Sequence, residues 1–152
     1  MQSWSFSTFH FPVRLRPIES LVTVPYLGDM AELFEKNFFD LTKDRQIREH
    51  LEHLDKKQIV LTGCETDVCV LQSCLGLLSL DYEVYIVEDL LFSASPNVGS
   101  AVARMQSAGA VLVSYKTLYY ELLGSVCGDG FSEEMEQQFG PLPDDLTDSA
   151  AG

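Results

Sequence analysis

The residues best suited to chemistry form one short segment, Gly-Cys-Glu-Thr-Asp-Val-Cys-Val at positions 63–70. It follows an apolar, strand-like run that ends at Thr62, and it opens a helical pattern that continues to about Leu80. Thr66 is a good N-cap residue, because its hydroxyl can accept a hydrogen bond from a free backbone N–H of the first turn. Cys69 then lies at the third helical position, where unpaired N–H groups and the helix dipole favour a thiolate. The segment therefore predicts a cysteine nucleophile.

Core packing is the competing interpretation of Cys69, because cysteine is among the most often buried residues and behaves there as a small hydrophobe. Position alone does not separate the two interpretations. The spacing of the four cysteines matches neither a zinc pattern nor a disulfide framework; they are Cys64, Cys69, Cys74 and Cys127. His50 and His53 lie three residues apart in a polar helical pattern, and exposure of this helix face to solvent accounts for both residues. We therefore expect no metal and no cofactor.

Reduced thiols of this kind are typical of a cytoplasmic compartment, which is the localisation we expect. An organelle is the alternative, because the first sixteen residues contain Arg14 and Arg16 but no acidic residue, a composition found in transit peptides.

The elements that must position the segment alternate between strand and helix. The predicted strands are residues 59–62, 84–87 and 110–114, and the predicted helices are residues 67–80, a helix from Ser95-Pro96 to Ala108 that stops at Gly109, and 117–126. An earlier helical pattern starts at Asp40, which can cap it, as can Thr42, and its apolar residues can share one face: Leu41, Ile47, Leu51 and Leu54. Strands and helices that alternate with short connections predict parallel βαβ units and an α/β fold.

Three blocks carry a resemblance to the isochorismatase-like cysteine hydrolases, and most closely to the branch of isochorismatase domain-containing proteins. They are residues 63–70, 83–89 (Glu-Val-Tyr-Ile-Val-Glu-Asp) and 103–110 (Ala-Arg-Met-Gln-Ser-Ala-Gly-Ala). The resemblance implies a three-layer fold with helices on both faces of the parallel sheet. It implies three segments: a divergent N-terminus at 1–30, an isochorismatase-like domain at 31–127, and an acidic, flexible tail at 128–152.

The resemblance also implies roles for named residues. Cys69 matches the family nucleophile, and Lys36, in the stretch Phe34 to Phe39, matches the catalytic lysine. By spacing alone, Lys36 is an ordinary surface lysine. The family's non-proline cis peptide would join Cys64 to Glu65. The N–H groups of Glu65 and Cys69 would then hold the oxyanion of a tetrahedral intermediate.

The family's catalytic aspartate has no match in this chain. It follows the first strand of the family domain, whereas residues 1–28 contain no aspartate and the first one is Asp29. We therefore expect the N-terminal part of the family domain to be missing or altered here. Glu35, Glu65 or Asp89 could substitute, and nothing in the sequence selects one of them.

The predicted function is hydrolysis of the C–N bond of a small amide, or of a related acyl bond, by a cysteine nucleophile, with weak or no activity. The alternative is a non-catalytic interaction protein that keeps the scaffold, since a fold does not guarantee an activity. A flavodoxin-like binder is a third interpretation, which the lack of a glycine-rich loop around Gly63 disfavours.

Charge and hydropathy limit the partners. A net charge of −13, with only ten Lys and Arg residues, is unsuited to binding a phosphate backbone, so we expect no nucleic acid. No apolar run is long enough to cross a membrane. The expected partners are a small-molecule substrate and further copies of the chain, because Leu77, Leu78 and Leu80 widen the apolar surface of the nucleophile helix.

Overall fold

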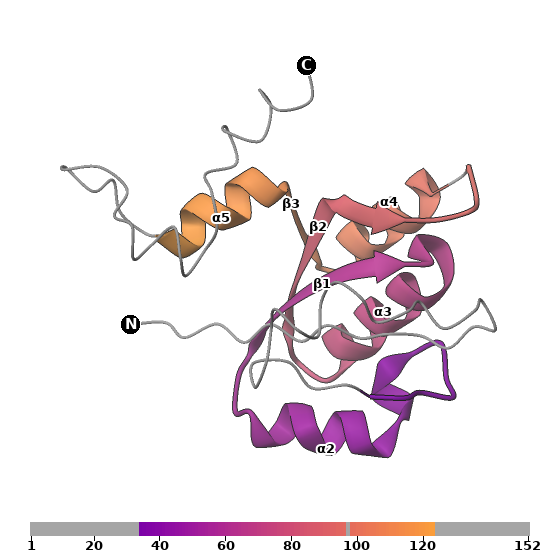
Figure 1. Cartoon of the computed structure of the whole chain (residues 1–152), viewed down its shortest axis with the longest axis vertical. Helices are drawn as coiled ribbons and strands as arrows, with labels where there is room; N and C mark the ends of the chain where they lie inside the picture. Colours follow the sequence, from indigo (N-terminus) through magenta and orange to yellow (C-terminus); the bar gives the residue numbers. More distant parts are fainter. Residues whose placement is uncertain (1–33, 97, 124–152) are drawn as a thin grey trace, which may run out of the picture. The chain divides into compact units, whose positions relative to one another are not determined.

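The computed structural model describes residues 34–96 and 98–123, which divide into two compact units after Leu112. Their elements, in chain order, are η2 (Leu41–Lys43), α2 (Arg45–His53), β1 (Gln58–Cys64), η3 (Thr66–Val70), α3 (Leu71–Ser79), β2 (Glu83–Phe92), α4 (Gly99–Ser107), β3 (Val111–Val113) and α5 (Tyr115–Leu123) (Figure 1). The predicted segments 1–30 and 128–152 lie outside the described residues.

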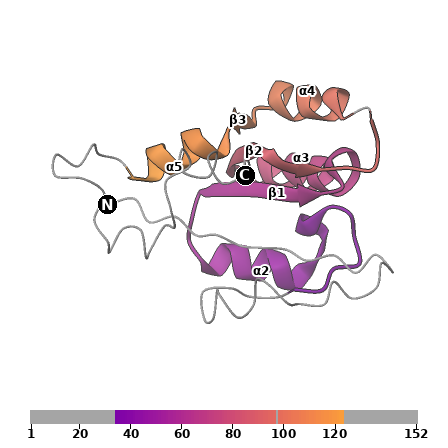
Figure 2. The same cartoon turned by 45° about the horizontal axis from the view of Figure 1, so that its top comes forward.

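The strands form one sheet in the order β1-β2-β3, and β1 and β2 run parallel. Helix α3 connects β1 to β2, and α4 connects β2 to β3. The two helices contact each other, as expected when successive right-handed crossovers cover the same face of a sheet (Figure 2). The predicted α/β fold built from βαβ units is confirmed.

Strand β2 is longer than predicted, and its pairing with β1 is irregular. Gln58 to Leu61 pair with Glu83 to Ile86, but Gly63 lies opposite Leu91 and Cys64 opposite Phe92. Gly63 has φ +113°, a backbone conformation that residues with a Cβ rarely adopt. The sequence pattern ended this strand at Val87, because the charged residues Glu88 and Asp89 interrupt the apolar run. The extension carries β2 to the end of β1.

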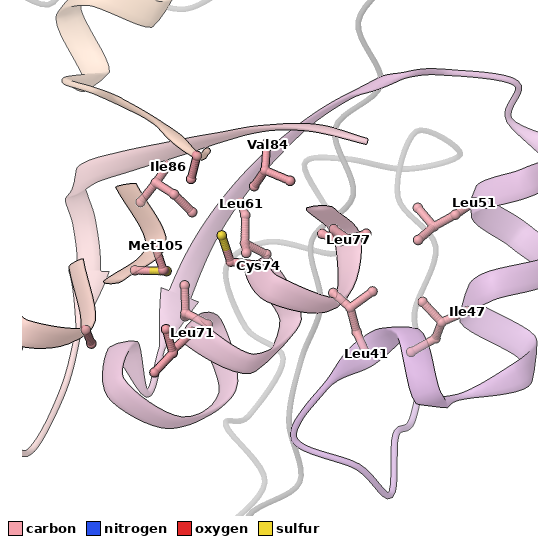
Figure 3. Close-up of a cluster of buried hydrophobic side chains, with 13 residues drawn as sticks. Leu41, Ile47, Leu51, Leu61, Leu71, Cys74, Leu77, Val84, Ile86 and Met105 are labelled. Atoms are coloured by element: carbon pink, nitrogen blue, oxygen red, sulfur yellow. The ribbon is translucent and has the colours of Figure 1, made fainter. Parts of the chain in front are cut away.

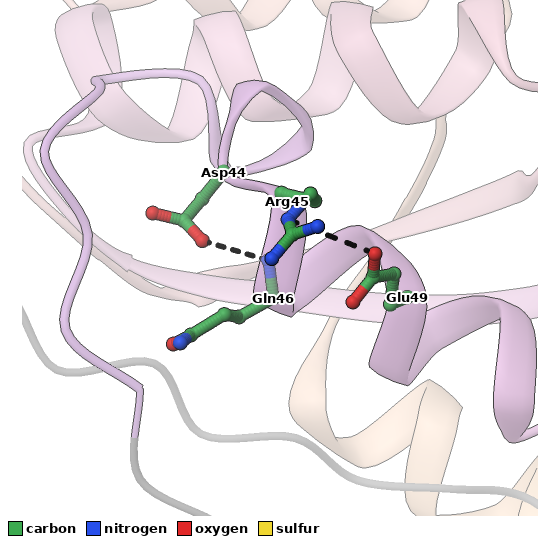
Figure 4. Close-up of polar contacts among 4 residues, drawn as sticks. All are labelled: Asp44, Arg45, Gln46 and Glu49. Atoms are coloured by element: carbon green, nitrogen blue, oxygen red, sulfur yellow. Dashed lines mark hydrogen bonds and ion pairs between the residues drawn. The ribbon is translucent and has the colours of Figure 1, made fainter.

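Two separate helical segments replace the single helix predicted from Asp40. Asp40 caps the short η2, where its Oδ1 accepts a bond from the Thr42 N–H at 2.9 Å. Asp44 then caps α2, where its Oδ1 accepts from the Gln46 N–H at 3.0 Å (Figure 4). The Arg45–Glu49 ion pair, 3.8 Å long and exposed at both ends, adds little stability.

The core is a cluster of apolar side chains from the helices and the two longer strands. Ile47 and Leu51 of α2 belong to it, as the helical pattern predicted, whereas Leu54 is only half-buried. The other labelled members are Leu41, Leu61, Leu71, Cys74, Leu77, Val84, Ile86 and Met105 (Figure 3). Leu77 is fully buried here, so it adds nothing to the exposed apolar surface that the sequence suggested for α3.

Helix α4 begins later than predicted. It starts at Gly99 without a side-chain cap, not at Pro96. The expected cap, Ser95, makes other bonds: its N–H donates to the Ser93 Oγ at 3.2 Å, and its hydroxyl bonds to Asp67. The predicted end is confirmed, because Gly109 follows the helix with φ +112°.

Helix α5, in the second unit, begins at Tyr115, two residues before the prediction. The Ser114 Oγ accepts a bond from the Thr117 N–H at 3.0 Å and so satisfies a donor of the first turn. Within residues 34–96 and 98–123, no helix is long and apolar enough to cross a bilayer.

Candidate active site

The turn that carries Cys69 is π-helical. Strand β1 ends at Cys64, the peptide bond from Cys64 to Glu65 is cis, and η3 follows directly. The Glu65 carbonyl accepts bonds from the N–H groups of Val68 at 3.2 Å and Val70 at 3.0 Å. Such wide turns are rare and occur frequently at functional sites. The cis bond lies where the family resemblance placed it.

The predicted cap at Thr66 is wrong. Glu65 occupies the N-cap position of η3 and makes no side-chain capping bond. Thr66 is buried inside η3, and its hydroxyl donates to the carbonyl of Phe92 at 2.9 Å. The extension of β2, which local pattern did not predict, supplies this acceptor. Thr66 therefore joins η3, the turn that contains Cys69, to the neighbouring strand β2.

The three described cysteines differ in their surroundings. Cys64 is exposed, and partial burial together with the nearby Glu65 and Cys69 raises its pKa. Cys74 is fully buried in the core, which raises its pKa to about 11. At pH 8 only about a thousandth of such a thiol is ionised. Cys69 is buried in its turn, with 4% of its surface exposed.

Lys36 is not a surface lysine. It is 8% exposed, and its Nζ donates to the carbonyl of Phe38 at 2.9 Å and to that of Phe39. Burial lowers the pKa of Lys36, while electrostatic interactions with Cys69 and Asp40 act in the opposite direction. Lys36 and Cys69 therefore lie within electrostatic reach of each other, which neither spacing nor propensity predicted.

The loop that contains Lys36 packs against one face of the helix formed by η3 and α3. Cys69, Ser73 and Gly76 follow the i, i+4, i+7 spacing of a single helix face. The Ser73 hydroxyl donates to the Phe39 carbonyl at 3.1 Å and accepts from the Leu41 N–H at 3.2 Å. The Phe39 carbonyl thus accepts from both Ser73 and Lys36. Ser73 and Gly76 were missed by the sequence analysis, although this row of small residues was visible in it.

Gly76 leaves room for the side chains that cap η2. A Cβ there would lie 2.6 Å from the Thr42 Oγ1 and 2.7 Å from the Asp40 Oδ2, and it would also collide with the Asp40 Oδ1. The hydroxyl and N–H of Thr42 both donate to that Oδ1, at 2.7 and 2.9 Å. The two side chains are short and bonded to each other, so they cannot move away freely.

We expect Gly76→Ala to destabilise the fold by about 1–3 kcal/mol, the usual range for an overpacked site. Urea unfolding of the variant and of the wild type measures the difference. Gly99→Ala is the matched control, because nothing lies within 4 Å of the added Cβ in the first turn of α4. It should be neutral or slightly stabilising. Equal unfolding midpoints for Gly76→Ala and wild type would contradict the packing described here.

The acidic candidates for the missing base lie in different surroundings. Glu35 and Asp89 are exposed, and Asp29 lies outside the described residues. The Glu65 Oε2 accepts bonds from the Ser93 Oγ at 2.9 Å and from the Ala94 N–H at 2.7 Å. Its carboxylate is therefore engaged by the loop after β2. Asp40 acts electrostatically on Lys36. The sequence analysis predicted it as a helix cap and not as a residue of the site.

A cavity of about 390 Å³ adjoins this loop. Its described lining residues come from η3, β2, α4 and the loop between β2 and α4; they do not include Cys69 or Lys36. In the part of the chain that the structure describes, no three His, Cys, Asp or Glu side chains gather closely enough to hold a metal ion.

Known proteins resemble this chain in sequence and in structure. The family model of the isochorismatase domain matches residues 22–117, more than half of the chain. Isochorismatase domain-containing protein 2 of Xenopus laevis is 33% identical over 126 residues, which are 80% of this chain and 60% of that protein. The chain spans about half the length of several other curated relatives that it matches.

Two solved structures share the fold. YcaC from Pseudomonas aeruginosa, determined with hexane-2,5-diol and covalent acrylamide, has a TM-score of 0.67 and 27% identity, over 85% of this chain and 67% of that one. The YcaC gene product of Escherichia coli, an octameric hydrolase of unknown specificity, has a TM-score of 0.61 and 23% identity, over 72% and 53%. From the family-model match and the Xenopus relative, we conclude that this chain belongs to the isochorismatase domain family.

Proposed function

We propose that this chain is a cysteine hydrolase that cleaves the C–N bond of a small amide, or a related acyl bond. The observation that carries the proposal is the burial of Lys36 within electrostatic reach of Cys69, on a loop that Ser73 ties to the nucleophile helix. The covalent acrylamide of the Pseudomonas YcaC supports the nucleophile in this proposal, because acrylamide is an electrophile that nucleophiles attack at its double bond.

In the proposed reaction, the Cys69 thiolate attacks the carbonyl carbon and forms a C–S bond. The positive charge of Lys36 stabilises the thiolate, and the N–H groups of Glu65 and Cys69 stabilise the oxyanion. The C–N bond then breaks, and the amine leaves after it takes up a proton. Water attacks the thioester, releases the carboxylic acid and restores the thiol.

Proton transfer limits the rate in this scheme. No described carboxylate has been assigned to protonate the leaving amine, and general acid–base catalysis is typically worth 10²–10⁴-fold. We therefore expect slow hydrolysis of amides, but faster acylation by p-nitrophenyl acetate, whose leaving group needs no proton.

Ammonia release from nicotinamide and carbamoyl amines, measured beside acylation by p-nitrophenyl acetate, tests the proposal. The expected result is release slower than roughly 1 s⁻¹, an ordinary enzymatic rate, together with an acetyl group on Cys69 found by peptide mass mapping. A Cys69 that reacts with no acyl donor would remove the proposal. It would favour the alternative function, an interaction protein that keeps the scaffold. That alternative is motivated by the family's catalytic aspartate, which has no match in this chain.

We also propose that copies of the chain associate and that it works in a reducing compartment such as the cytoplasm. The octameric state of the Escherichia coli YcaC gene product supports association, as do exposed apolar side chains such as Leu80 and Phe92. The cysteines that the structure describes are all free thiols, which supports a reducing compartment. A compact monomer in light scattering at tens of micromolar would exclude association, and fractionation of cells checks the compartment.

A further inference from the structure

The end of β2 and the loop after it bind the turn between the cis peptide and Cys69. The Thr66 hydroxyl donates to the carbonyl of Phe92, the last residue of β2, and the Ser93 Oγ lies 2.9 Å from the Glu65 Oε2 and 2.7 Å from the Asp67 Oδ1. Glu65 and Asp67 are therefore each hydrogen-bonded to the loop after β2, and Thr66, between them, to the end of the strand. The irregular end of β2, opposite Cys64, brings the loop to this place.

Ser93 lies at the centre of this contact. A hydroxyl has one proton, so it donates to one carboxylate at a time. The shorter distance, 2.7 Å to Asp67 against 2.9 Å to Glu65, favours Asp67 as the acceptor, and donation from Ser93 then lowers the pKa of Asp67. Glu65 keeps the Ala94 N–H at 2.7 Å as a donor of its own. The Ser93 Oγ also accepts from the Ser95 N–H at 3.2 Å, so the loop is ordered around this hydroxyl.

We infer that Ser93 is a positioning residue: its hydroxyl holds the Glu65–Asp67 turn so that the N–H groups of Glu65 and Cys69 remain in place for the oxyanion. The inference rests on the proposed function. Ser93 acts through the turn and has no contact with the reacting atoms in this scheme. Its loss should therefore slow the step that creates an oxyanion and leave the intrinsic reactivity of the Cys69 thiolate intact.

Two reagents separate these effects. p-Nitrophenyl acetate acylates the thiolate through a tetrahedral oxyanion and releases p-nitrophenolate. Iodoacetamide alkylates the same sulfur: a C–S bond forms, iodide leaves, and no charge develops on the carbonyl oxygen. The ratio of the two rates at Cys69, from site-resolved mass spectrometry, therefore reports the oxyanion site alone.

We expect Ser93→Ala to lower the acylation rate about 10-fold, less than the 10²–10³-fold loss from removing an oxyanion donor outright, with the alkylation rate changed less than about twofold. Ser93→Thr keeps the hydroxyl and should restore most of the ratio. Ser79→Ala is the matched control, because among the described residues the Ser79 hydroxyl bonds only a carbonyl of its own helix, that of Gly76 at 2.7 Å; its ratio should equal that of the wild type.

Thermal unfolding shows whether each variant is folded. If Ser93→Ala does not fold, Asp67→Asn, which weakens the acceptor and keeps its shape, takes its place and should lower the same ratio. One result overturns the inference while the proposed function stands: both reagents modify the wild-type Cys69, and the ratio of their rates is unchanged in the variants, whether the two rates stay constant or fall together. A wild-type Cys69 that neither reagent modifies removes the proposed function and the inference with it.

Discussion

Replacing Cys69 by alanine is expected to reduce ammonia release from small amides to the uncatalysed background and to abolish acetylation by p-nitrophenyl acetate. The nucleophile forms the covalent intermediate, so no partial route through the thioester remains without it. Alanine is close in volume to the buried thiol, and Cys69 sits in a π-helical turn whose backbone bonds do not use its side chain. The fold should therefore survive the change.

Cys64→Ala is the matched control for this experiment. Cys64 is the neighbouring thiol and the more accessible of the two, yet its pKa is raised, which reduces its thiolate at neutral pH. It should keep the wild-type rates. If Cys64→Ala loses acetylation while Cys69→Ala keeps it, the assignment of the nucleophile is wrong. Cys74, whose pKa is about 11 in the core, should stay unmodified in every variant.

Replacing Lys36 by methionine is expected to slow acylation and alkylation of Cys69 at pH 7 by about 10- to 100-fold. Methionine keeps the length and apolar stem of the lysine but removes the positive charge. A nearby opposite charge favours an ionised group by roughly one to three orders of magnitude. Both reagents consume the thiolate, so both rates should fall together, unlike the pattern expected for Ser93→Ala. The two variants thus separate the charge of the site from the geometry of its turn.

The pH dependence of this effect has a defined sign. Burial lowers the pKa of Lys36 from the ordinary lysine value of 10.5, so its charge is lost at a lower pH than that of an exposed lysine. The advantage of the wild type over Lys36→Met should therefore shrink as the pH rises through the pKa of Lys36. Rates measured from pH 6 to 10 check this course.

Lys43→Met is the matched control for Lys36. Lys43 is an exposed lysine at the end of η2, on the same segment of the chain, and its removal changes the net charge by the same amount. Its effect on Cys69 should be small, because exposed charges are screened by water and salt. Equal rates in Lys36→Met and wild type would show that Lys36 does not act on the thiolate.

Local patterns in the sequence predicted the elements of this fold. Apolar runs of strand length located β1 and β2, and the helical spacing of Ile47 and Leu51 located α2. Gly109 located the end of α4, because a left-handed residue after a helix favours glycine. The segment that contains Cys69 was visible as a strand, a turn and a helix start. Each of these signals comes from residues only a few positions apart, so it can be recognised without knowing how the chain folds.

The tertiary structure decided which side chains meet. Lys36 and Cys69 are far apart in the chain, and the bonds of Ser73 to Phe39 and Leu41, with the space beside Gly76, help to hold the loop of Lys36 on the helix that follows Cys69. The hydroxyl of Thr66, expected to accept a bond from an N–H of its own helix, instead donates to the Phe92 carbonyl. That acceptor depends on the irregular extension of β2, where the charged residues Glu88 and Asp89 interrupt the pattern of a strand. Sequence periodicity reports which face of an element is apolar, but a hydrogen bond between distant segments depends on where the folded chain places donor and acceptor. The sequence could therefore single out Cys69 as the proposed nucleophile, whereas the residues that hold its turn in place could not be predicted from it.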